Sequence, residues 1–169
     1  MLKNRVTMFS SPFNTPVETG LRVLSILSAA YPKPFDLHHL SYLDYLLVHS
    51  NDIPDGPDSL HPPTPYRSGE ILVRRSLIEQ GLLLFWSRGL VDRHFTEEGI
   101  IYAGTNSSGT FLDSLYTMYV KNLREHANWL LNRLGDLPKE QIQMMVEKNM
   151  DKWGSECTFE SIFIEESIS

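Results

Sequence analysis

The sequence predicts a mainly α-helical protein with one small β-hairpin, organised as a winged-helix-like domain followed by two C-terminal helices. Three segments with helical periodicity come first. Two short apolar strands on either side of a turn at Gly99 come next. Three helices followed by a hairpin is the element order of a winged helix-turn-helix, in which the hairpin would be the wing.

Length and composition fit one domain with a helical extension. The chain has 169 residues, of which 41% are hydrophobic and 21% are charged, close to the averages of globular proteins. We expect a loosely ordered N-terminus at residues 1–12 and the winged-helix-like domain at 13–106. A helical extension packed on that domain should cover 107–154, and an acidic and hydrophobic tail should follow at 155–169.

The first helix has a clear beginning and end. Thr15 is a good N-cap residue, Pro16 suits the first helical position, and Glu18 completes a capping box. Apolar residues then recur with a helical period until Pro32, so the helix should end near Ala30.

The second helix should begin at the N-cap Asp36 and run to about His49. The segment from Ser50 to Arg67 contains five prolines and little periodicity, and it should form a long loop of about 18 residues. In DNA-reading helix-turn-helix proteins this connection is a turn of a few residues. Its length therefore argues against a standard DNA-reading arrangement.

The third helix and the hairpin have strong signals. Residues 69–88 are strongly helical, and Gly89 is well placed to stop the helix. Strands are expected at 90–95 and 100–104, joined by a turn that contains Gly99. Beyond them we expect a helix at 112–134, closed by Gly135, and a final helix from about Pro138 to Trp153.

Charge and cysteine content restrict the class of protein. The net charge is −6, and residues 156–169 contribute −4 of it through four glutamates without a basic residue, which leaves −2 for the rest. Neither value resembles the basic surface of an independent nucleic-acid binder. The single cysteine, Cys157, and the lack of a signal peptide or a long apolar segment predict a cytoplasmic protein without a membrane span.

Arginines near the third helix are the best candidates for contacts with other molecules. Arg74 and Arg75 lie on that helix and Arg93 lies in the expected wing, so these three are the candidate DNA contacts. However, apolar residues cover most of the circumference of the helix, which favours a protein interface over DNA readout. The candidate partner contacts are Tyr66, Arg67, Arg74, Arg75, Phe159, Ile162 and Phe163.

No pattern indicates catalysis, a metal or a cofactor. The adjacent His38 and His39 point about 100° apart on a helix, whereas zinc ligands on a helix need three or four residues between them. The acidic loop at 52–58 lacks the spacing of an EF-hand, and the loop at 104–109 lacks the lysine of a P-loop. Acidic neighbours of Cys157 would suppress its thiolate. We therefore expect a protein that is not an enzyme.

Three segments of the chain resemble a known family. They are FNTPVETGLRVLSIL, FDLHHLSYLDYLLVHSNDIPDGPDSLHPPTPYRSGEILVRRSLIEQGLLLFWSRGLV and KNMDKWGSE. They resemble the middle component of bacterial ABC-three-component systems, the small subunit of Lamassu-type anti-phage and anti-plasmid defence. The similarity spans about 13–156, and its most specific part is the long proline-rich loop between two helices.

The resemblance implies a hetero-oligomer. Its other subunits would be an ABC ATPase of the structural-maintenance-of-chromosomes (SMC) or double-strand-break-repair kind and an effector, often a nuclease. The middle component would be an adaptor that bridges the two and restrains the effector, and it would contact DNA only weakly or indirectly. The alternative is a winged-helix DNA-binding regulator that uses Arg74 and Arg75.

Overall fold

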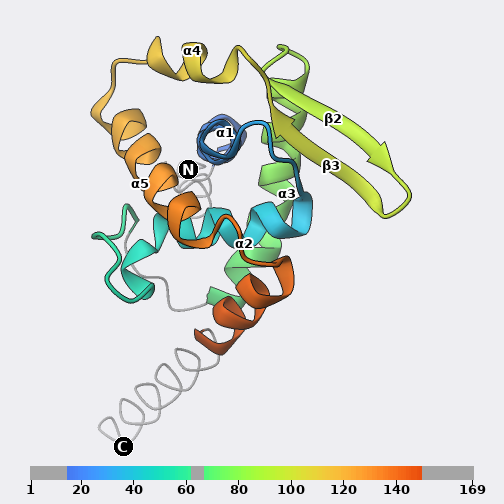
Figure 1. Cartoon of the computed structure of the whole chain (residues 1–169). Helices are drawn as coiled ribbons and strands as arrows, with labels where there is room; N and C mark the ends of the chain where they lie inside the picture. Colours follow the sequence, from blue (N-terminus) through green and yellow to red (C-terminus); the bar gives the residue numbers. More distant parts are fainter. Residues whose placement is uncertain (1–14, 62–66, 150–169) are drawn as a thin grey trace, which may run out of the picture.

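The computed structural model describes residues 15–61 and 67–149, and they form six helices, one short 3₁₀ helix and three strands (Figure 1). In chain order these are α1 (Pro16–Ala30), β1 (Phe35–Asp36), α2 (Leu37–Val48), η1 (Ser50–Asp52), α3 (Arg67–Trp86), β2 (Val91–Thr96), β3 (Gly99–Gly104), α4 (Ser108–Asp113), α5 (Met118–Leu134) and a last helix at 139–149. The prediction of a mainly α-helical fold with a small hairpin is confirmed, and so is the order of three helices followed by a hairpin.

Helix α1 is the centre of the molecule. Figure 1 shows it almost end-on, with the other helices around it and the hairpin projecting to one side. Val23, Leu24, Ile26 and Leu27 have no exposed surface, because α1 packs against α3, α5, α2 and α4. Apolar side chains from every long helix join one continuous core, to which α5 and the last helix contribute Leu123, Leu130 and Ile142, among others.

Both predicted N-caps are present. The Thr15 hydroxyl accepts a hydrogen bond from the Glu18 N–H at 3.2 Å, and the Asp36 carboxylate accepts one from the His39 N–H at 2.7 Å. The predicted stop of α3 is also correct, since Gly89 has a φ of +71° and the Leu90 N–H reaches back to the Phe85 carbonyl at 2.9 Å. This 6→1 bond is typical of a glycine-terminated helix.

The sheet has a third strand that the sequence analysis missed. β3 is the central strand, paired antiparallel with β2 on one edge and with the two-residue β1 on the other. Phe35 lies opposite Tyr102, which in turn lies opposite Arg93. Two residues are too few to show the alternation by which a strand is recognised in a sequence. β1 ties the start of α2 to the hairpin and so holds the hairpin against the helices.

The predicted helix at 112–134 is wrong in its first part. It is divided into α4, which begins within the supposed linker at Ser108, and α5, and residues 114–117 break the helix between them. Thr117 has extended backbone angles, and its hydroxyl accepts a hydrogen bond from the Val120 N–H at 3.2 Å. A threonine that caps the start of a helix in this way ends the helical run that precedes it. Three helical segments, not two, therefore follow the hairpin in the described part of the chain.

Helices α1 and α3 cross at two glycines. A Cβ atom at Gly81 would lie 2.7 Å from Gly20 Cα and 2.8 Å from the carbonyl oxygen of Pro16. These are backbone atoms, which a side-chain rotation cannot move away. The absence of a side chain at both positions therefore allows α3 to lie directly on α1.

We predict that Gly81→Ala destabilises the protein. The added methyl group must push two helix backbones apart, and overpacking of this kind costs about 1–3 kcal/mol of the free energy of unfolding, as urea titration would measure it. Gly109→Ala is the matched control, because a Cβ there would lie 3.6 Å from its nearest neighbour, the Ser28 hydroxyl. Equal losses in the two variants would contradict the role of the crossing.

Candidate partner-binding surface

A buried ion-pair cluster joins the first three helices. Asp44 on α2 accepts hydrogen bonds from Arg22 Nε of α1 at 2.8 Å and from Arg74 Nη1 of α3 at 2.7 Å. Arg22 Nη2 also donates to the Thr19 hydroxyl at 3.2 Å. Neither Arg22 nor Asp44 has any exposed surface. A charged group buried this deeply is stable only with such partners.

The charges in the cluster stabilise one another. Burial by itself would raise the pKa of Asp44, but the guanidinium groups of Arg22 and Arg74 outweigh burial and hold that pKa below its usual value. His61 lies close by, and its Nε2 is 3.2 Å from the Tyr119 hydroxyl. Burial and the two arginines lower the pKa of His61 to about 4. His61 is therefore neutral at pH 7 and adds no further positive charge to the cluster.

The structure contradicts a surface role for Arg74. Only 3% of its side chain is exposed, and its guanidinium group contacts Asp44, so it is not placed to touch DNA or a partner. The spacing explains its position, because Arg74 lies three residues after Ile71 and four before Ile78, on the stripe of α3 that faces the core. The prediction that Arg74 contacts DNA or a partner is therefore wrong, because Arg74 belongs to that buried stripe.

The other predicted contact residues have different positions. Arg75 is exposed on α3, and Arg93 lies on β2 with its side chain partly buried. Arg67 is the first residue of α3, but its side chain is not among those described. Tyr66 and the tail residues Phe159, Ile162 and Phe163 lie outside the described residues.

Exposed apolar side chains gather where the hairpin meets the outer side of α3. The α3–hairpin surface consists of Leu83 and Trp86 on α3, Arg93 and Phe95 on β2, and Ile100 on β3. Phe95 is 73% exposed and Trp86 is 44% exposed. Phe95 lies opposite Ile100 in the sheet, so the two form an apolar pair near the tip of the hairpin. The expectation that α3 carries more apolar surface than its own domain covers fits this arrangement.

Arg93 lies at the centre of this surface. Its guanidinium carbon is 4.3 Å from the centre of the Trp86 ring and 5.2 Å from that of the Phe95 ring. Both distances are within the range of cation–π interactions. Arg93 Nε is buried, yet no hydrogen-bond acceptor contacts it. The sequence predicts Arg93 as a cation of the hairpin, but its two aromatic neighbours depend on contacts that local patterns do not reveal.

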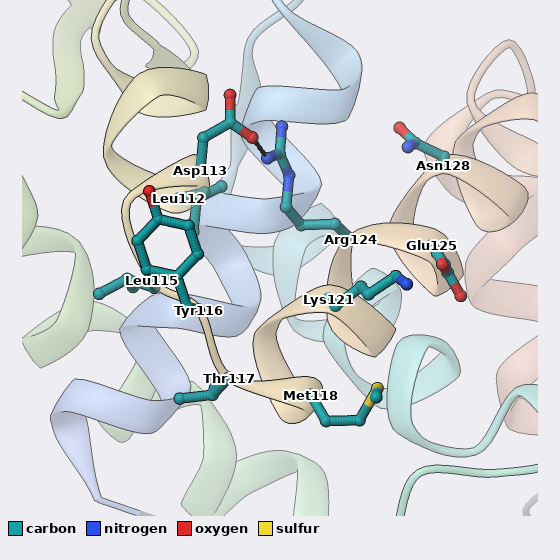
Figure 2. Close-up of a pocket in the computed structure, with 10 residues that line it drawn as sticks. All are labelled: Leu112, Asp113, Leu115, Tyr116, Thr117, Met118, Lys121, Arg124, Glu125 and Asn128. Atoms are coloured by element: carbon teal, nitrogen blue, oxygen red, sulfur yellow. Dashed lines mark hydrogen bonds and ion pairs between the residues drawn. The ribbon is translucent and has the colours of Figure 1, made fainter.

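A second surface lies at the junction of α4 and α5. A groove of 440 Å³ lies there, lined by apolar side chains such as Leu112 and Met118 and by charged ones such as Lys121 and Glu125 (Figure 2). Arg124 and Asp113 form an ion pair across it. Tyr116, in the break between the helices, is 95% exposed. This groove was not predicted, because the sequence pattern indicates one continuous helix at 112–134 and the groove forms where that helix is broken.

Within residues 15–61 and 67–149, no three His, Cys, Asp or Glu side chains lie close enough together to hold a metal ion. His38 hydrogen-bonds through Nε2 to the Tyr42 hydroxyl at 2.9 Å. The backbone N–H of its neighbour His39 donates a hydrogen bond to the N-cap residue Asp36.

In the same part of the chain, no helix has the length and apolar character needed to cross a membrane.

The described residues form a small, mainly helical protein with exposed apolar side chains at two separate places, the α3–hairpin surface and the α4–α5 junction. The chain belongs to the family described as ABC-three component (ABC-3C) system Middle Component 2, whose model matches residues 12–156. It is therefore one component of a multi-component ABC system and has hetero-oligomeric partners. The predicted membership of the middle-component family is confirmed. No curated protein and no solved structure matches the chain.

We predict that Asp44→Asn strongly destabilises the protein at neutral pH. The substitution leaves two buried guanidinium groups without their carboxylate, which costs about 3–5 kcal/mol of the free energy of unfolding. Asp113→Asn is the matched control, because Asp113 is 69% exposed and such a pair is worth about 0–1 kcal/mol. Urea titration of each variant gives the comparison.

The same variant has a defined pH dependence. Because the pKa of Asp44 is lower in the folded protein, its contribution is fully present above the unfolded value of 3.8 and is lost as the pH falls through the folded pKa. Wild type and Asp44→Asn should therefore converge in stability only in strong acid. A difference that stays constant down to pH 2 would contradict this account.

Proposed function

We propose that this protein is a non-catalytic adaptor of an antiviral defence complex of the Lamassu type. In that complex it bridges an ABC ATPase of the SMC or double-strand-break-repair kind to an effector such as a nuclease, and it restrains the effector until the ATPase senses foreign DNA. The observation that carries the proposal is the family match over residues 12–156, which makes the chain the middle component of an ABC system. The complex would act in the cytoplasm.

The two exposed surfaces support a bridging role. A bridge needs two contact areas that can be occupied at the same time. The hairpin lies on one side of α1 and the α4–α5 junction lies on the other (Figure 1). Aromatic side chains are prominent on both, in Trp86 and Phe95 on one surface and Tyr116 on the other. Exposed aromatic residues of this kind are typical of protein interfaces.

Co-purification tests the proposal. We expect the tagged chain, produced together with the ATPase and the effector encoded beside it, to elute with both in one complex. Phe95→Ala should weaken the affinity for one partner and Tyr116→Ala that for the other, each by about tenfold or more. Truncation of a central aromatic residue at an interface costs at least about 1–2 kcal/mol of binding free energy. Met144→Ala, an exposed apolar residue on the last helix, is the control.

Two outcomes would contradict the proposal in different ways. Elution of the wild-type chain free of both partners would rule out the adaptor. Loss of the same partner by Phe95→Ala and Tyr116→Ala would rule out a bridge built from these two surfaces.

A DNA-binding regulator is the second candidate, and the order of three helices followed by a hairpin favours it. With Arg74 buried, Arg75 and Arg93 remain as its contacts. This candidate predicts duplex binding by the isolated chain that weakens steeply with salt and is lost in Arg75→Ala combined with Arg93→Ala. The adaptor predicts no such binding in fluorescence anisotropy at low salt.

A further inference from the structure

The environment of Arg93 is unusual for an arginine near a protein surface. Its guanidinium group lies against Trp86 and next to Phe95, but among the residues that the structure describes it makes no hydrogen bond and no ion pair. Glu79 on α3 and Arg93 both act on the Tyr102 hydroxyl, yet the two do not pair with each other. Arg93 is thus a cation that is held in place by aromatic rings and has lost part of its water.

This geometry leaves the hydrogen-bonding capacity of Arg93 unused. A guanidinium group that stacks on a ring keeps its N–H donors in its own plane, where they can bind an acceptor from the side. Nε is buried without an acceptor, which is unfavourable in the chain as it stands. A carboxylate matches the fork of guanidinium donors best among the groups that a protein can supply.

The surroundings of Arg93 restrict the ligand further. Phe95 and Ile100 are apolar residues on the same face of the hairpin. Leu83 and Trp86 extend the apolar part of the α3–hairpin surface onto α3. A ligand that hydrogen-bonded to Arg93 but carried only polar groups would leave these apolar side chains exposed to water. The ligand should therefore carry apolar side chains beside its carboxylate.

The charge of the hairpin favours a ligand with a single carboxylate over a polyanion. Asp92, Glu97 and Glu98 lie on the hairpin or in its turn, all exposed, against the one arginine. This excess of negative charge would repel a DNA backbone, which brings many phosphates at once. It would also repel the chain's own residues 155–169, which contain four glutamates and no basic residue. The charge of the hairpin is compatible with a ligand that places one carboxylate on Arg93 and basic residues near Glu97 and Glu98.

We propose that the α3–hairpin surface binds a partner segment in which a single Asp or Glu pairs with Arg93 and adjacent apolar residues cover Phe95 and Ile100. The inference rests on the proposed function, since it supplies the chemistry of one of the two partner contacts. Trp86 is a positioning residue, because it holds the guanidinium plane in the orientation that the carboxylate meets.

A photo-cross-link identifies the segment directly. Phe95 is replaced by p-benzoylphenylalanine in the full chain, which is produced with the neighbouring ATPase and effector and irradiated after the complex is purified. Mass spectrometry of the cross-linked peptide should find a partner segment with an Asp or Glu among apolar residues. A cross-link to DNA, to residues 155–169, or to a partner segment without a carboxylate would overturn the proposal.

Substitution of Arg93 tests the ion pair. Arg93→Gln should weaken the complex on the order of tenfold or more, because it removes a hydrogen-bonded charge at an interface. Arg133→Gln is the matched control, since Arg133 also stacks on a tryptophan, Trp129 at 5.8 Å, but on α5. Arg93→Glu combined with Arg at the cross-linked acidic residue should restore binding, which a merely structural role of Arg93 would not allow.

The possible failures are distinguishable. If the wild-type chain binds neither partner, the proposed function fails and this inference fails with it. If the complex forms and Arg93→Gln binds as tightly as wild type, or if the charge exchange restores nothing, the inference alone is wrong and the adaptor stands.

Discussion

The contact of Asp44 with Arg22 and Arg74 is the constraint on which the arrangement of the helices depends. Each of the three residues comes from a different helix, so the cluster joins α1, α2 and α3 at one point inside the core. The hydrophobic effect has no preferred direction, whereas buried charges must keep their partners at hydrogen-bond distance. The close approach of Gly20 and Gly81 adds a second fixed point between α1 and α3.

Two fixed points on α3 determine which of its sides faces outward. Arg74 is hydrogen-bonded to Asp44 and Gly81 lies against α1, so rotation or sliding of the helix would disturb one of these contacts. In this arrangement Leu83 and Trp86 remain exposed. Pairing of β1 with β3 holds the hairpin beside the same helix. The core thus stabilises an apolar surface that the chain itself does not cover.

The sequence was most informative where local chemistry decides the structure. The caps at Thr15 and Asp36, the glycine stop at Gly89 and the hairpin all depend on neighbouring residues, and they were predicted correctly. The burial of Arg74 could have been predicted from its spacing to Ile71 and Ile78. Because arginine is usually exposed, its residue type favoured a surface position over the buried one that the spacing indicates. What the sequence could not show depends on contacts between distant residues, such as β1 with β3 and Trp86 with Arg93.

Rigidity of this core also bears on how an adaptor could transmit a signal. Because α1 contacts α3, α4 and α5, fully buried side chains connect the hairpin side of the molecule to the α4–α5 groove. Closely packed interiors pass on displacements and deform little. Under the proposed function, such a core would couple the two partners by holding them at a set distance and orientation.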